Sequence, residues 1–548
     1  MAKNNMSRNL SRKIEMSNLS LNNSHFISST LSNTPKKGYK TILKNSSIML
    51  ALSLFLAGCN DNSSNTDDNT PADPVITLDT ELREIITAQE LTGDPSSDRE
   101  LPSIDDPQAQ LGMKLFYTKS LGGDLDSACV SCHHPMLGGG DDLVLPVGVD
   151  AEQPDLLGPG RIHSVTGEHY YSGAATVPRN SPTTFNIALW DSYMFHDGRV
   201  ESLGKTANKN GDDGLGIRTP DTAFGTSDDN AGNNLVTAQA RFPVTSAEEM
   251  RNFDNFLDLT NAEIRENLAQ RLGNYGDPLG GMLAMNNWLE EFKVGFEQPN
   301  GTAEELITYN NIAQAIAEYE RSQVFVETPW KQYVQGDNNA ISETAKRGAK
   351  LFFNSQENGG ANCSSCHSGD FFTDEDFHVI GMVQLGRGKG DGEYGTDDFG
   401  RYRESLNEDE KYAFRTPSLL NVTATGPWGH AGASLTLAHA IQSHLNPQKA
   451  LDEYDFSQLD PAIHATESVQ YTQQAIDKLV LNRAAGIPSI QDITLTDTEV
   501  EELVAFIETL TDPCVEDREC MSPWILDNTD GDPDGLRLIA VDDDNGAL

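Results

Sequence analysis

Cys129-Val-Ser-Cys132-His133 recurs later in the chain as Cys363-Ser-Ser-Cys366-His367, and this pair of motifs decides the fold. The spacing suits covalent attachment of haem, because two thiols can add to the two vinyl groups while the adjacent histidine reaches the iron. A redox dithiol or half of a zinc site would use the same cysteine spacing. The histidine directly after the second cysteine, present in both copies, argues against those alternatives. We therefore predict two covalently attached c-type haems, with His133 and His367 as axial iron ligands.

A similar lead-in precedes each motif. Leu111-Gly112-Met-Lys-Leu115-Phe116 stands before the first copy, and Arg347-Gly348-Ala-Lys-Leu351-Phe352 stands before the second. The chain therefore contains an internal repeat, and each half is expected to carry one haem.

The sequence around the motifs favours helices separated by long loops. Apolar residues recur at helical spacing from Ala303 to Arg321, which predicts one helix over that range. Thr496-Asp-Thr-Glu499 is a capping box that opens another helix, and Asp512-Pro513 ends it. Residues 205–234 and 386–400 are rich in Gly, Asn and Asp and are expected to be loops. We predict a mainly α fold with two cytochrome c-like haem domains and long loops.

The predicted organisation has five parts. It comprises a signal peptide, a tether, an N-terminal peroxidatic haem domain, a C-terminal electron-transfer haem domain and an acidic tail, at residues 1–58, 59–79, 80–325, 326–525 and 526–548. The two haem domains are expected to join near residues 325–342, and the tail is expected to be solvated, with weak calcium binding as the alternative.

Composition limits the classes of partner. The chain has 548 residues and is 37% hydrophobic, which is enough for at least two packed cores. Lys and Arg number 39 against 83 Asp and Glu, giving a formal charge of -44. Such a charge repels a phosphate backbone, so nucleic acid is excluded as a partner.

The N-terminus is typical of a bacterial lipoprotein signal. A long basic segment precedes an apolar run of roughly Ile48 to Ala57, followed by Gly58 and Cys59. The alternative is a buried apolar helix that happens to end in cysteine. We expect cleavage before Cys59 and lipidation of that residue, which places the protein in the cell envelope, on the periplasmic side and anchored to a membrane, with the outer membrane favoured.

Four further segments carry a family resemblance. They are Arg179-Asn-Ser-Pro-Thr-Thr-Phe-Asn186, Phe195-His-Asp-Gly-Arg199, Phe242-Pro-Val-Thr-Ser-Ala-Glu-Glu-Met250, and Arg415 to Asn421 with Pro427 to Gly432. Through them the chain resembles the bacterial di-haem cytochrome c peroxidase and MauG family over about residues 80 to 525. The resemblance implies that peroxide reacts at the N-terminal haem and that the C-terminal haem takes electrons from a donor protein.

The resemblance assigns a proton-transfer role to Glu249, which stands at the position of the family's acid–base glutamate. Cleavage of an O–O bond needs such a group to carry a proton between the two oxygens. Alternatively, Glu249 is one more solvated carboxylate in an acidic protein. His169 is the candidate for a distal ligand of the first haem, with His163 in the same loop as the alternative. If neither binds, the enzyme should need no reductive activation.

The second haem departs from both well-known branches of the family. His444 stands where the cytochrome-oxidising peroxidases have Met and MauG has Tyr, which suggests two histidine ligands and a lowered reduction potential. An exposed helix histidine is the alternative. His196 stands where the family usually has Trp between the haems, and Trp190, Trp428 or His196 itself could replace that relay.

Two further sites complete the predictions. The resemblance implies one calcium ion between the domains, held by the Asn180 side chain and the carbonyls of Thr425 and Pro427, in the all-oxygen coordination that this cation prefers. Cys514 and Cys520 lie outside the haem motifs in an oxidising compartment, so a local disulfide is expected between them.

Three functions remain open at this stage. The first is a peroxidase that reduces hydrogen peroxide to water with electrons from a small cytochrome c or cupredoxin. The second is a MauG-like high-valent di-haem oxidase that modifies a partner protein, and the third is a non-catalytic di-haem electron carrier. The Glu249 segment argues against a carrier, which needs no proton-transfer group. The acidity favours a basic donor, and the assembly state, including a homodimer, is left open.

Overall fold

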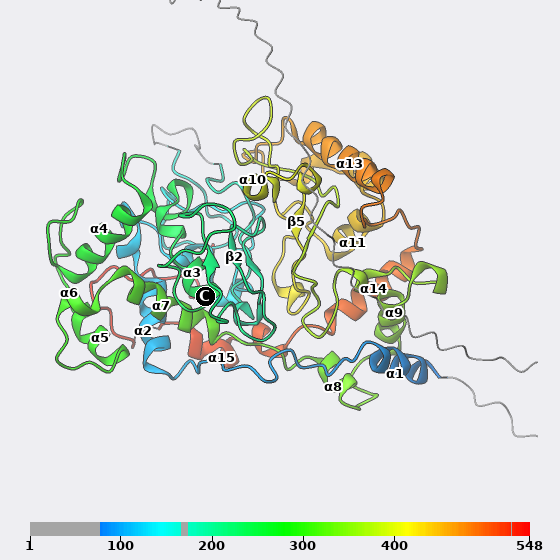
Figure 1. Ribbon diagram of the computed structural model, residues 1–548, viewed down its shortest axis with the longest axis horizontal. Helices are drawn as coiled ribbons and strands as arrows, with labels where there is room; N and C mark the ends of the chain where they lie inside the picture. The colour runs from blue at the N-terminus through cyan, green and yellow to red at the C-terminus, as the bar shows by residue number, and fades with distance from the viewer. Residues whose placement is uncertain (1–76, 166–173, 528) are drawn as a thin grey trace, which may run out of the picture. The chain divides into compact units, whose positions relative to one another are not determined.

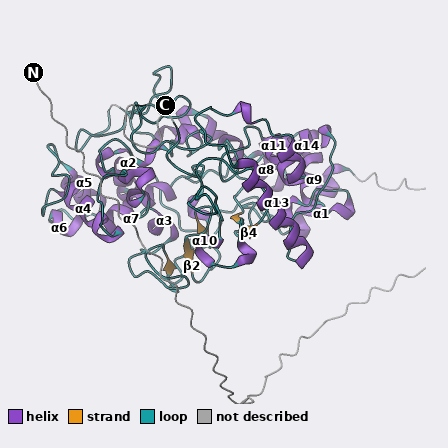
Figure 2. Ribbon diagram, turned by 90° about the horizontal axis from the view of Figure 1, so that it is seen from above, coloured by secondary structure: helices purple, strands orange, loops and turns teal. Residues whose placement is uncertain are grey.

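The computed structural model describes residues 77–165, 174–527 and 529–548. The predicted signal peptide, Cys59 and His169 lie outside these residues. Helices dominate the described chain and the strands are short (Figure 2), so the expectation of a mainly α fold is confirmed. None of the helices within the described ranges is long and apolar enough to cross a membrane.

The helices divide between two main cores. The first core contains α2 (Pro107–Tyr117), α4 (Asn261–Gly273), α5 (Trp288–Gly295), α6 (Ala303–Leu306) and α7 (Tyr309–Arg321), with α3 (Leu235–Gln239) packed on α7. The second core contains α1 (Leu78–Ala88), α8 (Pro329–Val334), α9 (Glu343–Phe353), α11 (Leu437–Leu445) and α14 (Asp497–Glu508). The remaining helices are α10 (Tyr402–Ser405), α12 (Pro447–Asp452), α13 (Ser468–Ala485) and α15 (Arg518–Met521).

Two small antiparallel sheets accompany the helices. One has the order β1 (Tyr193–Met194), β2 (Val200–Ser202) and β3 (Ile217–Arg218). The other pairs β4 (Phe377–His378) with β5 (Phe414–Arg415).

The internal repeat appears as two equivalent helix crossings. α2 crosses α7 and α9 crosses α14, and each crossing is made at a glycine of the repeated lead-in. A Cβ on Gly112 would lie 1.8 Å from the carbonyl oxygen of Ala315, and a Cβ on Gly348 would lie 1.8 Å from that of Glu502. Only glycine lets the helix backbones approach so closely. Each crossing therefore positions the haem-attachment motif that follows its first helix.

One predicted helix boundary is confirmed and another is wrong. Thr496 and Glu499 form the expected capping box at the start of α14. The single helix expected from Ala303 to Arg321 is broken into α6 and α7. Thr308 starts a new helix there, because its hydroxyl accepts the backbone N–H of Asn311.

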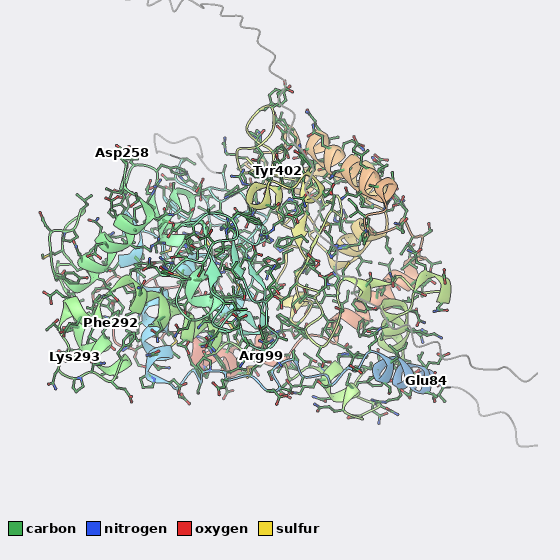
Figure 3. All side chains as sticks on the ribbon, in the orientation of Figure 1. Glu84, Arg99, Asp258, Phe292, Lys293 and Tyr402 are labelled. Atoms are coloured by element: carbon green, nitrogen blue, oxygen red, sulfur yellow. A yellow bond between two sulfur atoms is a disulfide. The ribbon has the colours of Figure 1, made fainter. Side chains whose placement is uncertain are left out.

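The first helix and the last segment of the described chain pack on different cores. α1 lies beside α9 (Figure 1), where Leu82 is completely buried in the second core although the sequence assigned this segment to the first haem domain. Arg99, on the connection that follows, binds the carboxylate of Asp191 through both terminal nitrogens at 2.8 and 3.1 Å (Figure 3). At the other end, Leu538 is 1% exposed in the first core.

The acidic tail is only partly solvated, which corrects the expectation for this segment. Asp534 is buried, and its Oδ2 accepts hydrogen bonds from the indole of Trp288 and the hydroxyls of Thr118 and Ser120, at 2.6, 3.0 and 2.5 Å. The backbone of Leu538 also donates to Tyr117 O at 2.8 Å. Just before the tail, Cys514 and Cys520 form a disulfide with an S–S distance of 2.00 Å.

Candidate functional site

A cavity beside the first motif brings together the residues that the sequence selected for peroxide chemistry. It has a volume of about 120 Å³ and is lined by Cys129, Cys132, His133 and Glu249, among others. The two cysteines are not paired in a disulfide, and burial raises the pKa of both thiols. A cavity with two unbonded thiols and a histidine on its wall fits a covalently held haem.

His133 is oriented by its surroundings. Its Nδ1 lies 3.1 Å from Gly139 O, and burial lowers the pKa of the ring. A neutral imidazole that donates from Nδ1 to a carbonyl presents Nε2 as the ligand atom, which is the arrangement typical of metal-bound histidines.

Glu249 is half-buried and lines the cavity, which disagrees with the alternative of a solvated surface carboxylate. It lies in a single π-helical turn, η6 (Ala247–Arg251), a kind of turn that is frequent at functional sites. Burial raises the pKa of its carboxyl, while the nearby cations Arg199 and Lys389 oppose that rise. The cavity therefore holds a carboxyl group whose raised pKa suits it to accept and release a proton.

Sequence reasoning missed three other polar residues of this cavity: Gln239, Glu320 and Lys389. Among the described residues, Gln239 Oε1 and Glu320 Oε2 have no hydrogen-bond partner. Burial raises the pKa of Glu320 to about 8. No motif marks these residues, because they come from helices α3 and α7 and from a loop of the other half.

The distal side of the first haem is only partly described. His169 lies outside the described residues. The alternative, His163, is fully buried, but it does not line the cavity and its Nε2 lies 3.9 Å from the Asp150 carboxylate.

The second site places two histidine rings opposite each other, tilted by 59°, across a gap of the size of a metal ion. The ring centroids of His367 and His444 are 6.3 Å apart. An ion bound to both Nε2 atoms at about 2.0 Å, a usual imidazole–metal bond length, would set the centroids roughly 6 Å apart. His367 Nδ1 lies 3.1 Å from Phe372 O and His444 Nδ1 lies 2.8 Å from Ala440 O, so both rings can present Nε2 to the gap.

The surroundings of His444 differ from those of an exposed helix histidine. It lies near the end of α11, and burial lowers the pKa of its ring. Burial also lowers the pKa of His367, to about 4, so both rings are neutral at physiological pH, as metal ligands must be. Cys363 and Cys366 are not paired in a disulfide here either.

A group of three potential metal ligands lies beside the second motif. Cys366, Asp374 and His378 offer sulfur, oxygen and nitrogen atoms within 4.8 Å of one another. Hydrogen bonds with Asp374 and then Cys366 raise the pKa of His378 to about 10, and His378 Nε2 is 2.7 Å from Asp374 Oδ2. We interpret this group as an imidazolium–carboxylate pair next to a haem-attachment sulfur, because Cys366 belongs to the second motif.

The candidate calcium ligands are also brought together in part. Asn180 Nδ2 lies 3.2 Å from Pro427 O and 3.1 Å from Leu143 O. Rotation of the amide would turn its oxygen to the same point and create the oxygen set that calcium prefers. Thr425 precedes Pro427 by two residues, and its hydroxyl donates to Val422 O at 3.1 Å.

His196 and Trp190 both line the first cavity. His196 is held by a contact of 3.0 Å between its Nε2 and Asn180 O, and burial followed by the Arg179 charge lowers its pKa to about 3. Trp190 packs edge-to-face on Phe371 at 5.1 Å between centroids. Phe371 precedes Phe372, whose carbonyl contacts His367, so this aromatic pair spans from the first cavity towards the second motif.

The comparisons with known proteins agree with this geometry. A family model described as di-haem cytochrome c peroxidase matches residues 106–339. The cytochrome c551 peroxidase of Pseudomonas aeruginosa is 25% identical over 370 residues, covering 67% of this chain and 80% of that protein. The methylamine utilization protein MauG of Methylorubrum extorquens is 28% identical over 337 residues, covering 61% and 67%.

Among solved structures, a MauG-like protein associated with microbial copper homeostasis is 20% identical with a TM-score of 0.49, and the match covers 78% of this chain and 97% of that one. The family match, the curated relatives and the two motif-centred sites support one conclusion. Residues 106–339 match the di-haem cytochrome c peroxidase family, and the chain is an oxidoreductase similar to cytochrome c peroxidases and MauG proteins.

Proposed function

We propose that this protein is a di-haem c-type peroxidase that reduces hydrogen peroxide to water with electrons from a small periplasmic donor, a cytochrome c or a cupredoxin. The observation that carries the proposal is the position of Glu249, which lines the same cavity as the first haem-attachment motif. An electron carrier has no use for a proton-transfer carboxyl group beside its haem.

The reaction consumes one peroxide, two electrons and two protons and yields two water molecules. The bound haems supply the redox chemistry, with electrons entering from the reduced donor. The carboxylate of Glu249 takes a proton from one peroxide oxygen and returns it to the other, which leaves as water when the O–O bond breaks.

The second site is proposed to pass electrons rather than to bind peroxide. The facing rings of His367 and His444 would occupy both axial positions of an iron, which leaves no position for a substrate. The formal charge of -44 favours a basic donor whose association weakens as salt increases. Covalent attachment of both haems, and a calcium ion at Asn180 and Pro427, belong to the same proposal.

Export and anchoring complete the proposal. Cys59 would be lipidated and would hold the enzyme on the periplasmic side of the envelope, with the outer membrane favoured, because covalent attachment of haem in bacteria takes place outside the cytoplasm. The basic and apolar segments before Cys59 support this placement.

The test is peroxide-dependent oxidation of a reduced small cytochrome by the mature holoprotein, followed optically. We expect rapid turnover by the native chain and at least a hundredfold loss in Glu249→Gln, with both haems still bound. Glu248→Gln is the matched control, because Glu248 is the adjacent carboxyl and its Oε2 instead accepts a hydrogen bond from Ser246, at 3.0 Å. Equal turnover by Glu249→Gln and the native chain would remove Glu249 from the mechanism.

A MauG-like oxidase that modifies a partner protein is the second candidate. Two observations favour it: His444 in place of a methionine, and similarity to MauG proteins as well as to peroxidases. The same experiment separates the two functions. A peroxide-induced spectral change that persists without oxidation of the cytochrome would indicate the oxidase, and no spectral change at all would indicate a carrier.

A further inference from the structure

The first cavity is completed by a lysine from the other half of the chain. Lys389 lies in loop 386–400, between β4 and α10, yet it lines the same cavity as His133 and Glu249. The residue is half-buried, and burial lowers the pKa of its ammonium group. Within the described residues, that ammonium group forms no ion pair or hydrogen bond with a carboxylate of its own.

The loop holds Lys389 in a defined position. Its backbone N–H donates to Asp397 O at 2.9 Å, and Asp391 and Asp397 exchange two backbone hydrogen bonds of 3.2 and 3.1 Å. Gly388 has a φ of +57°, and a Cβ there would lie 2.3 and 2.5 Å from the carbonyl oxygens of Thr396 and Asp397. The turn before Lys389 therefore requires glycine, and this turn fixes the backbone position of Lys389.

The loop is also docked firmly against the first half. Asp398 accepts two hydrogen bonds from the buried guanidinium of Arg179, at 2.6 and 2.8 Å, and Asp197 accepts a third at 2.6 Å. Burial would raise the pKa of Asp398, but the Arg179 charge outweighs it and holds that pKa well below its usual range. This buried cluster ties the loop to the segment that contains Asp197 and Arg199.

The charges around Glu249 come from both halves. Arg199 and Lys389 are the cations that face it, and Glu248 is the neighbouring like charge. Arg199 already approaches Asp197, at 3.4 Å. Lys389 in turn faces Arg199, Arg179, Glu249 and Asp197, and Arg179 is paired with Asp197 and Asp398. Glu320 also lines the cavity, but the carboxyl groups whose charges act on Lys389 are Glu249 and Asp197, and Asp197 is already paired with Arg179. Glu249 is thus the partner that remains for Lys389.

We propose that Lys389 is a positioning residue of the first cavity, whose ammonium group keeps Glu249 as a carboxylate so that it can accept a proton from hydrogen peroxide. The inference rests on the proposed function and makes the peroxide site depend on both halves of the chain. No electron passes through Lys389. The proton moves only between the two peroxide oxygens by way of Glu249.

The direction of the pH effect follows from the charges. Burial raises the pKa of Glu249, and the cations oppose that rise. Removing one cation raises it further, so a larger fraction of Glu249 is protonated and inactive at low pH. In Lys389→Gln we expect the acidic limb of the pH–rate profile to move to higher pH by about one unit. At a fixed pH on that limb, the reaction with peroxide would then be roughly tenfold slower.

The experiment mixes the holoprotein with hydrogen peroxide between pH 4 and 9 and records the first haem spectral change. Lys389→Arg, which keeps the charge, should restore the native profile. Lys449→Gln is the control, because Lys449 is an exposed lysine of α12 near Glu453, at 3.9 Å. A native profile in Lys389→Gln, with the reaction abolished in Glu249→Gln, overturns the role of Lys389 and leaves the proposed function intact.

A second measurement needs no turnover. The reduction potential of the first haem is titrated against pH, and the inflection that disappears in Glu249→Gln is assigned to that residue. This inflection should lie at higher pH in Lys389→Gln than in the native chain, and at the native pH in Lys389→Arg. A native reaction profile together with a native inflection in Glu249→Gln would overturn both the proposed function of Glu249 and the role of Lys389.

Discussion

The two haem-attachment motifs are alike in sequence, but the side chains around them differ. The first faces a cavity that contains the titratable groups Glu249, Glu320 and Lys389. The second faces the ring of His444. Under the proposed function, this difference in neighbouring residues separates the site that takes peroxide from the site that passes electrons.

Substitution of His444 tests this assignment. Met in its place should change the low-spin spectrum of the second haem and raise its reduction potential by on the order of 0.1 V, because a thioether favours the reduced iron more than an imidazole does. Spectroelectrochemistry on the holoprotein measures both quantities.

His439→Gln is the control for this substitution. His439 lies on the same helix, and its Nδ1 contacts the Ser434 hydroxyl at 2.9 Å instead of facing His367. An unaltered spectrum and potential in His444→Met would show that His444 is not the ligand.

At the scale of secondary-structure elements, each motif depends on the helix crossing that precedes it. Both crossings use a glycine and an aromatic contact, Phe116 on Tyr319 and Phe352 on Phe506, with ring centroids 5.0 and 5.1 Å apart. The similarity of the two crossings explains why the sequence repeat includes the lead-in as well as the cysteines.

Gly348→Ala should destabilise the second half by about 1–3 kcal/mol, because its Cβ would force α14 away from α9. Thermal unfolding followed by circular dichroism measures the loss. Thr344→Ala, at an exposed position of the same helix, should change the unfolding free energy by less than about 0.5 kcal/mol. Equal melting temperatures for Gly348→Ala and the native chain would contradict the close approach of these helices.

At the scale of the described chain, the two halves are joined in several ways. α1 packs in the second core, the C-terminal tail packs in the first, and Arg179 binds Asp398 of loop 386–400. The cavity beside the first motif likewise draws residues from both halves. These connections favour cooperative behaviour of the two haem sites.

Asp534→Ala should lower the free energy of unfolding by about 3 kcal/mol, because the buried donors of Trp288, Thr118 and Ser120 would lose their acceptor. It should also release the tail, making residues after 526 sensitive to limited proteolysis. Asp543→Ala, which removes an exposed carboxylate of the same tail, is the control. Native stability and native protease resistance in Asp534→Ala would show that this contact does not hold the tail.

Several features followed from the sequence alone. The repeated C-x-x-C-H motifs, their shared lead-in and the family segments were sufficient to predict a mainly helical di-haem protein and to single out Glu249. These features are local, since covalent attachment and helix capping require particular residues at fixed short spacings. For the same reason the capping box at Thr496 was predicted correctly. The break at Thr308 was not predicted, because apolar spacing continues across it.

Other features were decided only by the tertiary structure. In the sequence, Asp534 is one acid of a charged tail and Lys389 is one cation of a glycine-rich loop. The first is buried against Trp288 and the second lines the cavity of Glu249. The positions of both residues depend on contacts between segments far apart in the chain. Composition and periodicity do not reveal such contacts. The sequence therefore determined which cofactor chemistry this protein supports, whereas the packing of its two halves determined which charges surround the reacting groups.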